Sequence, residues 1–347
     1  MIKVLHASHV SNPTPPQGYG GIELIVDILA RYQLREGLDV KVMGVKNPHI
    51  KTDYEIIQVF EKPVSPSLRH KVKYMLKLLR EARDRDIIHL HAQWLIATTP
   101  ILRHAKMPIL LTLHADLSNN IVGYLAKRLN VALVAISHTQ KTRMERKGFK
   151  IYDVVYHGIE VEKYPFVKEK EDYLIYVGRI DETKGVHIAV RVANKLPTRL
   201  VIIGPITDKS YFKKYIEPYI DGKKIIYLGE VDFNTKVQYL ARARALLYPV
   251  QYEEFFGIVL AEALACGTPV IGFARGSVTE IVTHGVAGFL VNDEEEMLNS
   301  YKELDRINLE ELRKDVERRF SASTMAKKYI EIYNRLLNNN NGNSAKY

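Results

Sequence analysis

Two glutamates stand eight positions apart around the predicted start of an apolar helix. Glu254 lies in a loop that follows a buried strand, and Glu262 lies in the second turn of a helix that begins near Gly257. At about 1.5 Å per residue, eight positions of a helix span roughly 12 Å at most. This length matches the separation between the ribose and the hexose of a nucleotide-diphosphate sugar. The free N–H groups and the positive dipole end at the helix start favour an anion such as the diphosphate.

Two basic residues provide a second chemical group. Arg179 and Lys184 lie in a segment that follows a strand and enters a helix, and open parallel sheets bind ligands at the carboxyl ends of their strands. A charge-assisted hydrogen bond to phosphate is worth roughly 1.5–3 kcal/mol. Two such bonds would stabilise a departing diphosphate in the way that a metal ion otherwise does. The alternative is a solvated basic loop. A Walker A loop is excluded, because no Gly directly precedes Lys184 and no Ser or Thr follows it.

Glycines and histidines mark further candidate positions. Gly20 and Gly21 join the first predicted strand to the first long helix, and their missing side chains would let backbone N–H groups approach a phosphate closely. A flexible turn is the alternative. His114 ends a predicted strand, although most lone histidines are structural. His89 and His91 end another strand, where they could line an acceptor pocket or simply cap the strand.

Short apolar strands alternate with helical patterns in both halves of the chain, which predicts two doubly wound parallel sheets. The predicted strands are Ile2–Ala7, Val40–Val45, Ile87–His91, Ile109–His114, Val131–Ser137, Tyr173–Val177, Leu200–Ile203, Ile225–Leu228, Ala245–Tyr248, Pro269–Gly272 and Gly288–Val291. The predicted helices include 22–36 and 66–85 in the first half and 185–195, 210–221, 234–243, 257–265 and 278–283 in the second.

The segment from Glu254 to Glu262 resembles the E-x7-E signature of retaining glycosyltransferases of family 4. The basic segment resembles the Gly-Arg and Lys-Gly element of that family, and Gly20-Gly21 resembles its N-terminal glycine loop. The resemblance implies that Glu254 binds sugar hydroxyls, that Glu262 binds the ribose, and that His114 faces the sugar. Phe255 departs from the pattern, because a small residue is usual after the first glutamate.

Through this resemblance, the expected catalytic residues are His114, Arg179, Lys184 and Glu254. The expected donor-binding residues are Gly20, Gly21, Arg179, Lys184, Glu254, Phe256, Gly257, Ile258, Val259 and Glu262.

The resemblance extends from residue 1 to about residue 335 and implies a GT-B architecture, in which two Rossmann-like domains face a cleft. Residues 1–165 form the expected acceptor-binding domain, and residues 166–322 form the expected donor-binding domain. A helix over residues 323–337 is expected to pack back on the first domain. The polar residues 338–347 are expected to form a disordered tail.

Composition narrows the class of protein further. A length of 347 residues favours two domains. The single cysteine, Cys266, excludes an internal disulfide and suits a reducing cytosol. The N-terminus does not resemble a signal peptide, and no apolar run approaches the ~18 residues that would span a membrane. We expect no metal ion or other cofactor, since Asp84-Arg85-Asp86 lies between a basic helix and a strand, where solvated charges are normal.

Positive charge is concentrated in the first half of the chain. Residues 1–165 contain 24 Lys and Arg against 15 Asp and Glu, a net charge of +9, and the remainder contains 26 against 25, a net charge of +1. Such an asymmetry predicts an anionic partner for the first half. The basic amphipathic helix over residues 66–85 carries part of this charge, and its apolar face either packs on the sheet or docks on anionic lipid. Nucleic acid is not expected, because no aromatic-interleaved basic motif accompanies the charge.

The sequence therefore predicts a retaining, metal-independent glycosyltransferase that takes a nucleotide-diphosphate sugar as donor. UDP is the commoner donor nucleotide in the resembled family. The expected acceptor is a hydroxyl group of an anionic, lipid-linked or carbohydrate molecule. The expected location is cytoplasmic, and peripheral contact with the membrane is left open. Two alternatives remain, namely a nucleotide-sugar epimerase of the same fold and a non-catalytic nucleotide-sugar binding protein.

Overall fold

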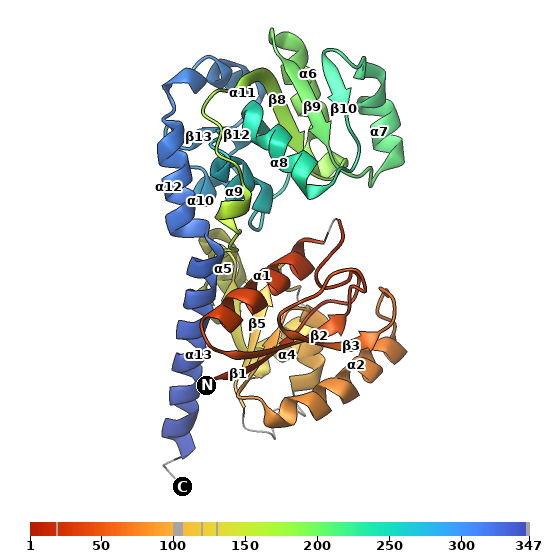
Figure 1. The fold of residues 1–347 in the computed structure, drawn as a ribbon, viewed down its shortest axis with the longest axis vertical. Coiled ribbons are helices and arrows are strands. Elements are labelled where there is room, and N and C mark those ends of the chain that lie inside the picture. The colour runs from red at the N-terminus through yellow and green to blue at the C-terminus, as the bar shows by residue number, and fades with distance from the viewer. Residues whose placement is uncertain (19, 100–106, 119–120, 130, 345–347) are drawn as a thin grey trace. The chain divides into compact units, whose positions relative to one another are not determined.

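The computed structural model describes residues 1–18, 20–99, 107–118, 121–129 and 131–344, and the chain divides into two compact units (Figure 1). The first unit contains Met1–Gly158 and Ala322–Tyr347, and the second contains Ile159–Ser321. The sequence placed the first boundary after residue 165. The observed boundary lies earlier because Ile159 already belongs to the second unit, where its N–H donates to the carbonyl of Phe320 at 2.8 Å.

The first unit is built on a seven-stranded parallel sheet with the order β3-β2-β1-β4-β5-β6-β7. Its strands are largely buried apolar runs, as expected for parallel strands that are covered on both faces. They are β1 (Lys3–Ala7), β2 (Asp39–Val45), β3 (Glu55–Phe60), β4 (Ile87–Leu90), β5 (Ile109–Leu113), β6 (Val131–Ala135) and β7 (Ile151–Val154).

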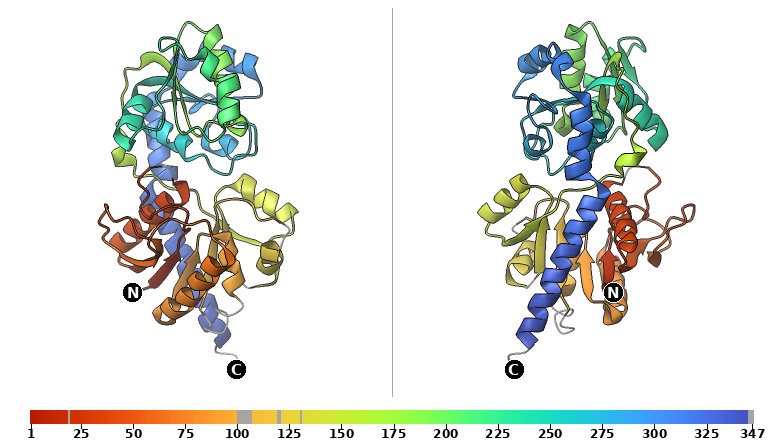
Figure 2. Two further views of the ribbon diagram at one scale, coloured as in Figure 1. Left: turned by 90° about the vertical axis from the view of Figure 1, so that its right-hand side faces the viewer. Right: turned by 60° about the vertical axis from the view of Figure 1, so that its left-hand side comes forward.

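The helices of the first unit include one from the far end of the chain. They are α1 (Gly21–Arg35), α2 (Leu68–Glu81), α4 (Ile121–Arg128), α5 (His138–Arg146) and α13 (Ala322–Ser344). The last of them runs beside α1 (Figure 2). Helix α13 also continues as far as Ser344, across residues that the sequence predicted to be a disordered tail. The extension is physically reasonable, because each residue added to a packed helix gains a backbone hydrogen bond without a new nucleation cost. The remainder of the predicted tail, 345–347, lies outside the described residues.

The second unit is built on a six-stranded parallel sheet with the order β10-β9-β8-β11-β12-β13. Its strands are β8 (Glu171–Val177), β9 (Arg199–Ile203), β10 (Ile225–Tyr227), β11 (Ala243–Tyr248), β12 (Val270–Phe273) and β13 (Gly288–Val291). Its helices are α6 (Val186–Lys195), α7 (Lys209–Tyr215), α8 (Phe233–Arg242), α9 (Ile258–Ala265), α10 (Val278–Ile281), α11 (Glu294–Tyr301) and α12 (Leu309–Phe320).

Both sheets are doubly wound in the Rossmann manner, which confirms the predicted fold class. In each sheet the strand order reverses beside the first strand, between β1 and β4 in one unit and between β8 and β11 in the other. Ligands of such sheets bind outside the carboxyl ends of the strands at this switch point. Within the part of the chain that is described, no helix is both long enough and apolar enough to cross a membrane.

Truncation tests the contribution of α13 to the first unit. Removing every residue after Ser321 deletes the buried side chains of Met325, Tyr329, Ile332 and Tyr333. At roughly 1.5–3 kcal/mol for each side chain, the loss is comparable with the ~5–15 kcal/mol that stabilises a whole domain. We therefore expect the first unit to unfold, as measured by calorimetry and circular dichroism.

The control truncation, after Asn338, removes residues 339–347, which are mostly polar, and should leave the melting temperature within about 2 °C of the full chain. A folded first unit in the shorter variant would contradict the role given to α13.

Candidate functional site

The switch point of the second sheet brings together the basic segment and the first glutamate. The basic segment follows β8, and its last turn, Glu182–Lys184, leads into α6. The neighbouring strand β11 is followed by the loop that carries Glu254, and α9 begins at Ile258 with Gly257 as its N-cap. The helix therefore begins where the motif predicts. Since β8 and β11 are adjacent, the two segments meet at the carboxyl ends of their strands.

Lys184 and Glu254 form a buried ion pair at this point. The Lys184 Nζ lies 2.7 Å from Glu254 Oε2 and 2.6 Å from the hydroxyl of Tyr252. Tyr252 also donates to both carboxylate oxygens, at 3.0 and 2.9 Å. Tyr248 donates to Oε2 as well. The two residues that the sequence assigned to the phosphate and to the sugar thus contact each other directly.

The protonation state of Glu254 follows from these contacts. Burial alone would raise the pKa of its carboxyl group, but the charge of Lys184 and the hydrogen bonds from Lys184, Tyr248 and Tyr252 outweigh burial and hold the pKa below its ordinary value. The carboxylate is therefore ionised at neutral pH and can accept hydrogen bonds from hydroxyl groups. It is not set up as a proton donor.

Close packing of backbone restrains the loop around Glu254. Gly276 has a φ of +57°, and a Cβ at this position would lie 2.3 Å from the carbonyl oxygen of Glu254. Gly185 has a φ of +71°, and a Cβ there would lie 2.0 Å from the carbonyl oxygen of Pro249. Only glycine satisfies both the left-handed conformation and the available space. The first close approach packs the loop against the segment that follows β12, and the second packs it against the segment that carries Lys184.

Arg179 lies in the same segment and remains about one-third exposed, with Nη2 3.5 Å from Asp181 Oδ2. Its guanidinium is accessible to a ligand, whereas the Lys184 side chain is only 15% exposed. Of the two predicted phosphate ligands, Arg179 therefore meets an incoming anion without first losing a strong contact.

The second glutamate is also paired. Glu262 accepts hydrogen bonds from Lys236 Nζ at 2.7 and 2.8 Å and from the hydroxyl of Tyr164 at 2.8 Å. The sequence analysis missed Lys236 and Tyr164 as partners, and neither is close to Glu262 in the sequence. A ribose that binds Glu262 has to share its carboxylate with Lys236 or replace that lysine.

The remaining predicted donor residues differ in how accessible they are. Ile258 and Val259 are partly exposed at the first turn of α9, where their backbone N–H groups suit the predicted contact with an anion. The Phe256 side chain is 2% exposed and packs edge-on against Phe320, with ring centroids 5.8 Å apart. As a ligand-contacting side chain Phe256 is therefore a poor candidate, because it belongs to the apolar core.

The first unit holds the predicted glycine loop. Gly20 is buried at the N-cap of α1, and the exposed Gly21 is the first helical residue. Their neighbour Tyr19 lies outside the described residues. Glu23 in the first turn is buried, and burial raises the pKa of its carboxyl group. The glycine loop is therefore at a helix N-terminus, as predicted, and its proposed contact with a phosphate stays a prediction.

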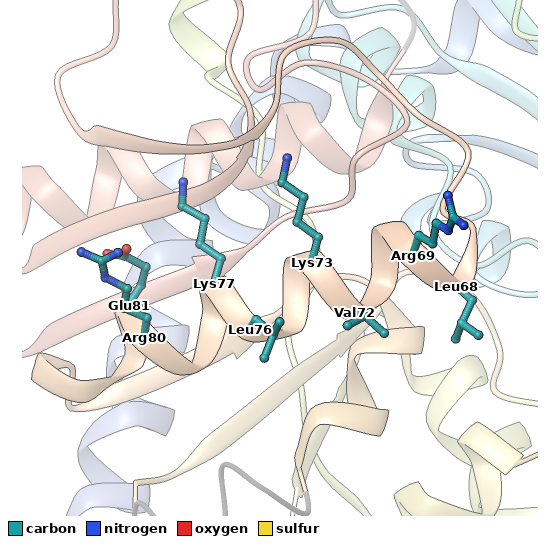
Figure 3. Close-up of a pocket in the computed structure, with 8 residues that line it drawn as sticks. All are labelled: Leu68, Arg69, Val72, Lys73, Leu76, Lys77, Arg80 and Glu81. Carbon is teal, nitrogen blue, oxygen red and sulfur yellow. The ribbon is translucent and has the colours of Figure 1, made fainter.

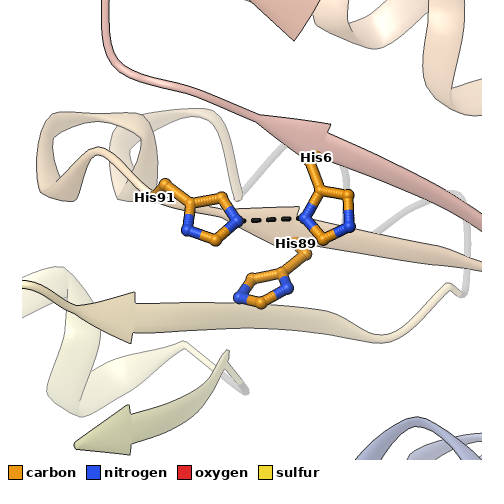
Figure 4. A group of neighbouring side chains, drawn as sticks. All are labelled: His6, His89 and His91. Carbon is orange, nitrogen blue, oxygen red and sulfur yellow. Dashed lines mark hydrogen bonds between the residues drawn. The ribbon is translucent and has the colours of Figure 1, made fainter. Parts of the chain in front are cut away.

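Four histidines of the first unit, His6, His89, His91 and His114, form a cluster that the sequence did not predict. His6 of β1 lies opposite His89 of β4 in the register of the sheet, and Figure 4 shows His91 hydrogen-bonded to His6. His91 in turn contacts His114, with 3.1 Å between the two ring nitrogens. The spacing of His89 and His91, two positions apart on one strand, was a signal for such a cluster. The histidine on β1, His6, could not be found in this way because it is 83 residues from His89 along the chain.

An acceptor-lining role does not fit His89 and His91, because both side chains are almost completely buried, at 0% and 2% exposure. The ring nitrogens of His89 contact Tyr333 and Thr112, each at 2.7 Å. The sequence analysis had given a structural role, as caps of the strand, as the alternative to the acceptor pocket. His114 is partly exposed and remains the member of the cluster that a ligand can reach.

Helix α2 presents a second feature of the first unit. Tyr74 and Leu78 are buried, whereas Leu68, Val72 and Leu76 are 78%, 41% and 61% exposed. The sequence treated the apolar residues of this helix as one face, but the structure divides them into two stripes. The exposed stripe borders an open hollow whose rim is basic (Figure 3). The lining residues are Leu68, Arg69, Val72, Lys73, Leu76, Lys77, Arg80 and Glu81.

Two family profiles match the chain one after the other. Residues 19–163 match the profile described as Glycosyltransferase Family 4, and residues 160–320 match the profile described as Glycosyl transferases group 1. Together they extend over both units and include every predicted site residue. The chain belongs to the glycosyltransferases of the family-4 type, a class of enzymes, and this confirms the family that the motifs indicated.

Individual proteins are also similar to this chain. A glycogen synthase of Mycobacterium tuberculosis is 26% identical over 245 residues, which span 61% of this chain and 59% of that protein. The crystal structure of AviGT4, a glycosyltransferase involved in avilamycin A biosynthesis, superposes with a TM-score of 0.75 at 25% identity, over 97% of this chain and 98% of that one. HepE from Anabaena, solved in complex with UDP-glucose, superposes with a TM-score of 0.77 at 20% identity, over 96% and 100%.

The buried histidines predict that the first unit loses stability in mild acid. Burial lowers the pKa of His6 to about 4 and of His157 to about 3, and lowers those of His89 and His91 well below the ordinary value. In the unfolded chain these histidines take up a proton as the pH falls through about 6.5, whereas in the folded chain they stay neutral. Their neutral rings therefore add their full contribution to the free energy of unfolding above that pH, and the contribution is lost as the pH falls below it. Each histidine contributes up to about 1.4 kcal/mol per pH unit.

Calorimetry between pH 7.5 and 5 checks this prediction. The transition of the first unit should move to lower temperature as the pH falls, and the variant His157→Gln should show a shallower slope. An equal slope in the two proteins would contradict it.

Proposed function

We propose that this protein transfers a sugar from a nucleotide-diphosphate sugar, with UDP as the nucleotide, to an acceptor hydroxyl with retention of configuration. The observation that carries the proposal is the ion pair between Lys184 and Glu254 at the switch point of the second sheet. In this pair a cation and a carboxylate lie next to the start of α9, which supports a site for a ligand with a diphosphate and sugar hydroxyls. The UDP-glucose complex of HepE, a neighbour in fold, supports the choice of UDP.

In the proposed reaction, the bond between the anomeric carbon and the diphosphate oxygen breaks while a bond to the acceptor oxygen forms. Arg179, Lys184 and the N–H groups of Ile258 and Val259 stabilise the charge that develops on the departing diphosphate. The acceptor proton passes to that same diphosphate, on the face from which it leaves. Glu254 holds hydroxyl groups of the sugar and does not attack it.

The two alternatives differ in what they consume. A nucleotide-sugar epimerase would convert the donor without any acceptor, and a binding protein would bind the donor without turnover. Incubating the protein with a panel of nucleotide-sugars, with and without a panel of sugar, lipid-linked and other hydroxyl acceptors, separates the three. Release of nucleoside diphosphate that depends on the acceptor, with a product of unchanged anomeric configuration, is the expected result.

Arg179→Ala and Lys184→Ala should each lower kcat/KM by at least 100-fold, about 2.7 kcal/mol, because each removes a cation that stabilises the leaving group. The matched control is Lys223→Ala, which removes an exposed cation of the same unit and should leave kcat/KM unchanged. Thermal unfolding of each variant is measured in parallel, since Lys184 also neutralises the buried Glu254. Turnover near that of the wild type in the Arg179 or Lys184 variant would remove the proposed role.

Metal independence is part of the proposal, because Arg179 and Lys184 supply positive charge where a divalent cation would otherwise act. Among the described residues, the only group of three or more potential metal ligands is His6, His89 and His91, which lies in the other unit. Activity should therefore persist in excess EDTA. A complete loss that Mg²⁺ or Mn²⁺ restores would overturn this part of the proposal.

We further propose that the acceptor is carried by an anionic lipid surface on which α2 docks. The exposed Leu68, Val72 and Leu76 supply the apolar contact, and the neighbouring cations meet the lipid headgroups, at about 1 kcal/mol for each cation near the surface. The net charge of +9 on residues 1–165 supports this choice of partner, because a neutral acceptor would gain nothing from such a field.

Co-sedimentation with liposomes tests the docking surface. Binding should rise with the fraction of anionic lipid, fall at high salt, and be lost in Leu76→Asp. The matched control is Ile121→Asp on α4, since Ile121 is similarly exposed at 73% but lies outside α2. If anionic and zwitterionic vesicles retain equally little protein at low salt, the acceptor is soluble.

A further inference from the structure

Four buried or partly buried side chains of the first unit form an unbroken line of hydrogen bonds that ends at His114. Gln33 Oε1 lies 2.8 Å from His6 Nε2, and His6 Nδ1 lies 3.0 Å from His91 Nε2. His91 Nδ1 lies 3.1 Å from His114 Nε2. Gln33 and His6 are completely buried, and His114 is the member that a ligand can reach.

A neutral imidazole has one N–H donor and one acceptor nitrogen, so each ring in the line determines the next. Because the Gln33 carbonyl can only accept, His6 carries its proton on Nε2 and accepts at Nδ1. His91 must then donate from Nε2 and accept at Nδ1. His114 must donate from Nε2, which leaves its Nδ1 as a free acceptor. The orientation of one amide thus fixes three tautomers.

A second line of hydrogen bonds begins at the same amide and is coupled to its orientation. Gln33 Nε2 donates to the hydroxyl of Tyr333 at 3.0 Å, and this hydroxyl lies 2.7 Å from His89 Nδ1. His89 Nε2 lies 2.7 Å from Thr112 Oγ1. If the amide of Gln33 turned over, every donor and acceptor in both lines would have to reverse, because each ring and hydroxyl between Gln33 and the ends of the lines is buried and has one partner on either side. The two lines therefore have two concerted states.

We propose that Gln33 and Tyr333 are positioning residues that hold His114 in the Nε2–H tautomer, with Nδ1 presented as a hydrogen-bond acceptor to the sugar. The consequence for turnover rests on the function proposed above, and the tautomer itself does not. Both residues act through His6 and His91, and neither touches the substrate.

A metal ion held by His6, His89 and His91 is the competing explanation for the cluster. The candidate ligand atoms lie within 4.8 Å of one another. All six ring nitrogens, however, already have a hydrogen-bond partner in the protein. A bound cation would have to break several of these contacts in a site with no carboxylate among its candidate ligands.

The tautomers can be observed directly by long-range ¹H–¹⁵N NMR on the full chain labelled with [¹⁵N]histidine, since the two nitrogens of a neutral ring differ strongly in chemical shift. We expect His6, His91, His114 and His89 all as Nε2–H tautomers at pH 7.5, with no change on addition of Zn²⁺. A protonated Nδ1 on His114, or loss of the His6 and His91 signals with Zn²⁺, would overturn the proposal.

Variants of the anchor test the coupling. Gln33→Met removes the acceptor, and Tyr333→Phe removes the group that orients the amide, so each should give His114 a new population with a proton on Nδ1. Gln33→Glu keeps an acceptor and should retain the Nε2–H form. The matched control is Tyr54→Phe, which removes a buried hydroxyl of the same unit that donates to Asp27, outside both lines. Unchanged His114 signals in folded Gln33→Met and Tyr333→Phe would contradict the coupling.

Turnover gives the functional readout. In the two anchor variants kcat should fall in proportion to the lost Nε2–H population, while nucleotide affinity, which depends on the second unit, stays unchanged. If the tautomers shift and kcat stays unchanged, the Nδ1 of His114 does not accept a hydrogen bond from the sugar, and that part of the proposal is wrong. If the wild-type protein shows no transfer at all, the proposed function fails, and the NMR result still decides whether the positioning exists.

Discussion

The ion pair between Lys184 and Glu254 is the constraint on which the second unit depends. The strand order reverses between β8 and β11, so the chain segments that leave these strands run to opposite sides and would otherwise part. The pair joins them, with 15% and 6% of the two side chains exposed. Removing either charge would leave the other buried without compensation, which costs several kcal/mol. The geometry of the proposed donor site is thus maintained by the groups that are proposed to act in it.

The residues around Glu254 are restricted by their contacts with it. Tyr248 and Tyr252 donate to the Glu254 carboxylate, and Gly276 leaves room for its backbone. A carboxylate that is already ionised and oriented needs no reorganisation when a sugar hydroxyl arrives, which is the condition under which fixed groups stabilise a transition state most effectively. The cost is that Lys184 has to exchange some of its contacts if it is to reach a phosphate.

The sequence predicted the features that depend on short-range pattern. Alternation of apolar strands and helices predicted all six strands of the second sheet and five of the seven strands of the first, without β3 and β7. The pattern from Glu254 to Glu262 predicted the start of α9. The sequence did not predict contacts between side chains that are distant in the chain. Lys236 and Glu262 are 26 residues apart, and Gln33 and Tyr333 are 300 residues apart. Periodicity also could not divide the apolar residues of α2, because a buried stripe and an exposed stripe have the same spacing.

The two switch points are built from different chemistry, and the difference suits different ligands. In the second unit, Lys184 and Glu254 are charged and lie beside a helix N-terminus, which is appropriate for a ligand with an anionic diphosphate and neutral hydroxyls. In the first unit, His6 and His89 occupy the equivalent strands, and burial keeps their rings neutral. A neutral network cannot attract an anion, but it can hold a hydrogen-bond acceptor in a fixed direction. The net positive charge that would attract an anionic partner to the first unit lies on its surface instead, where the cations of α2 are.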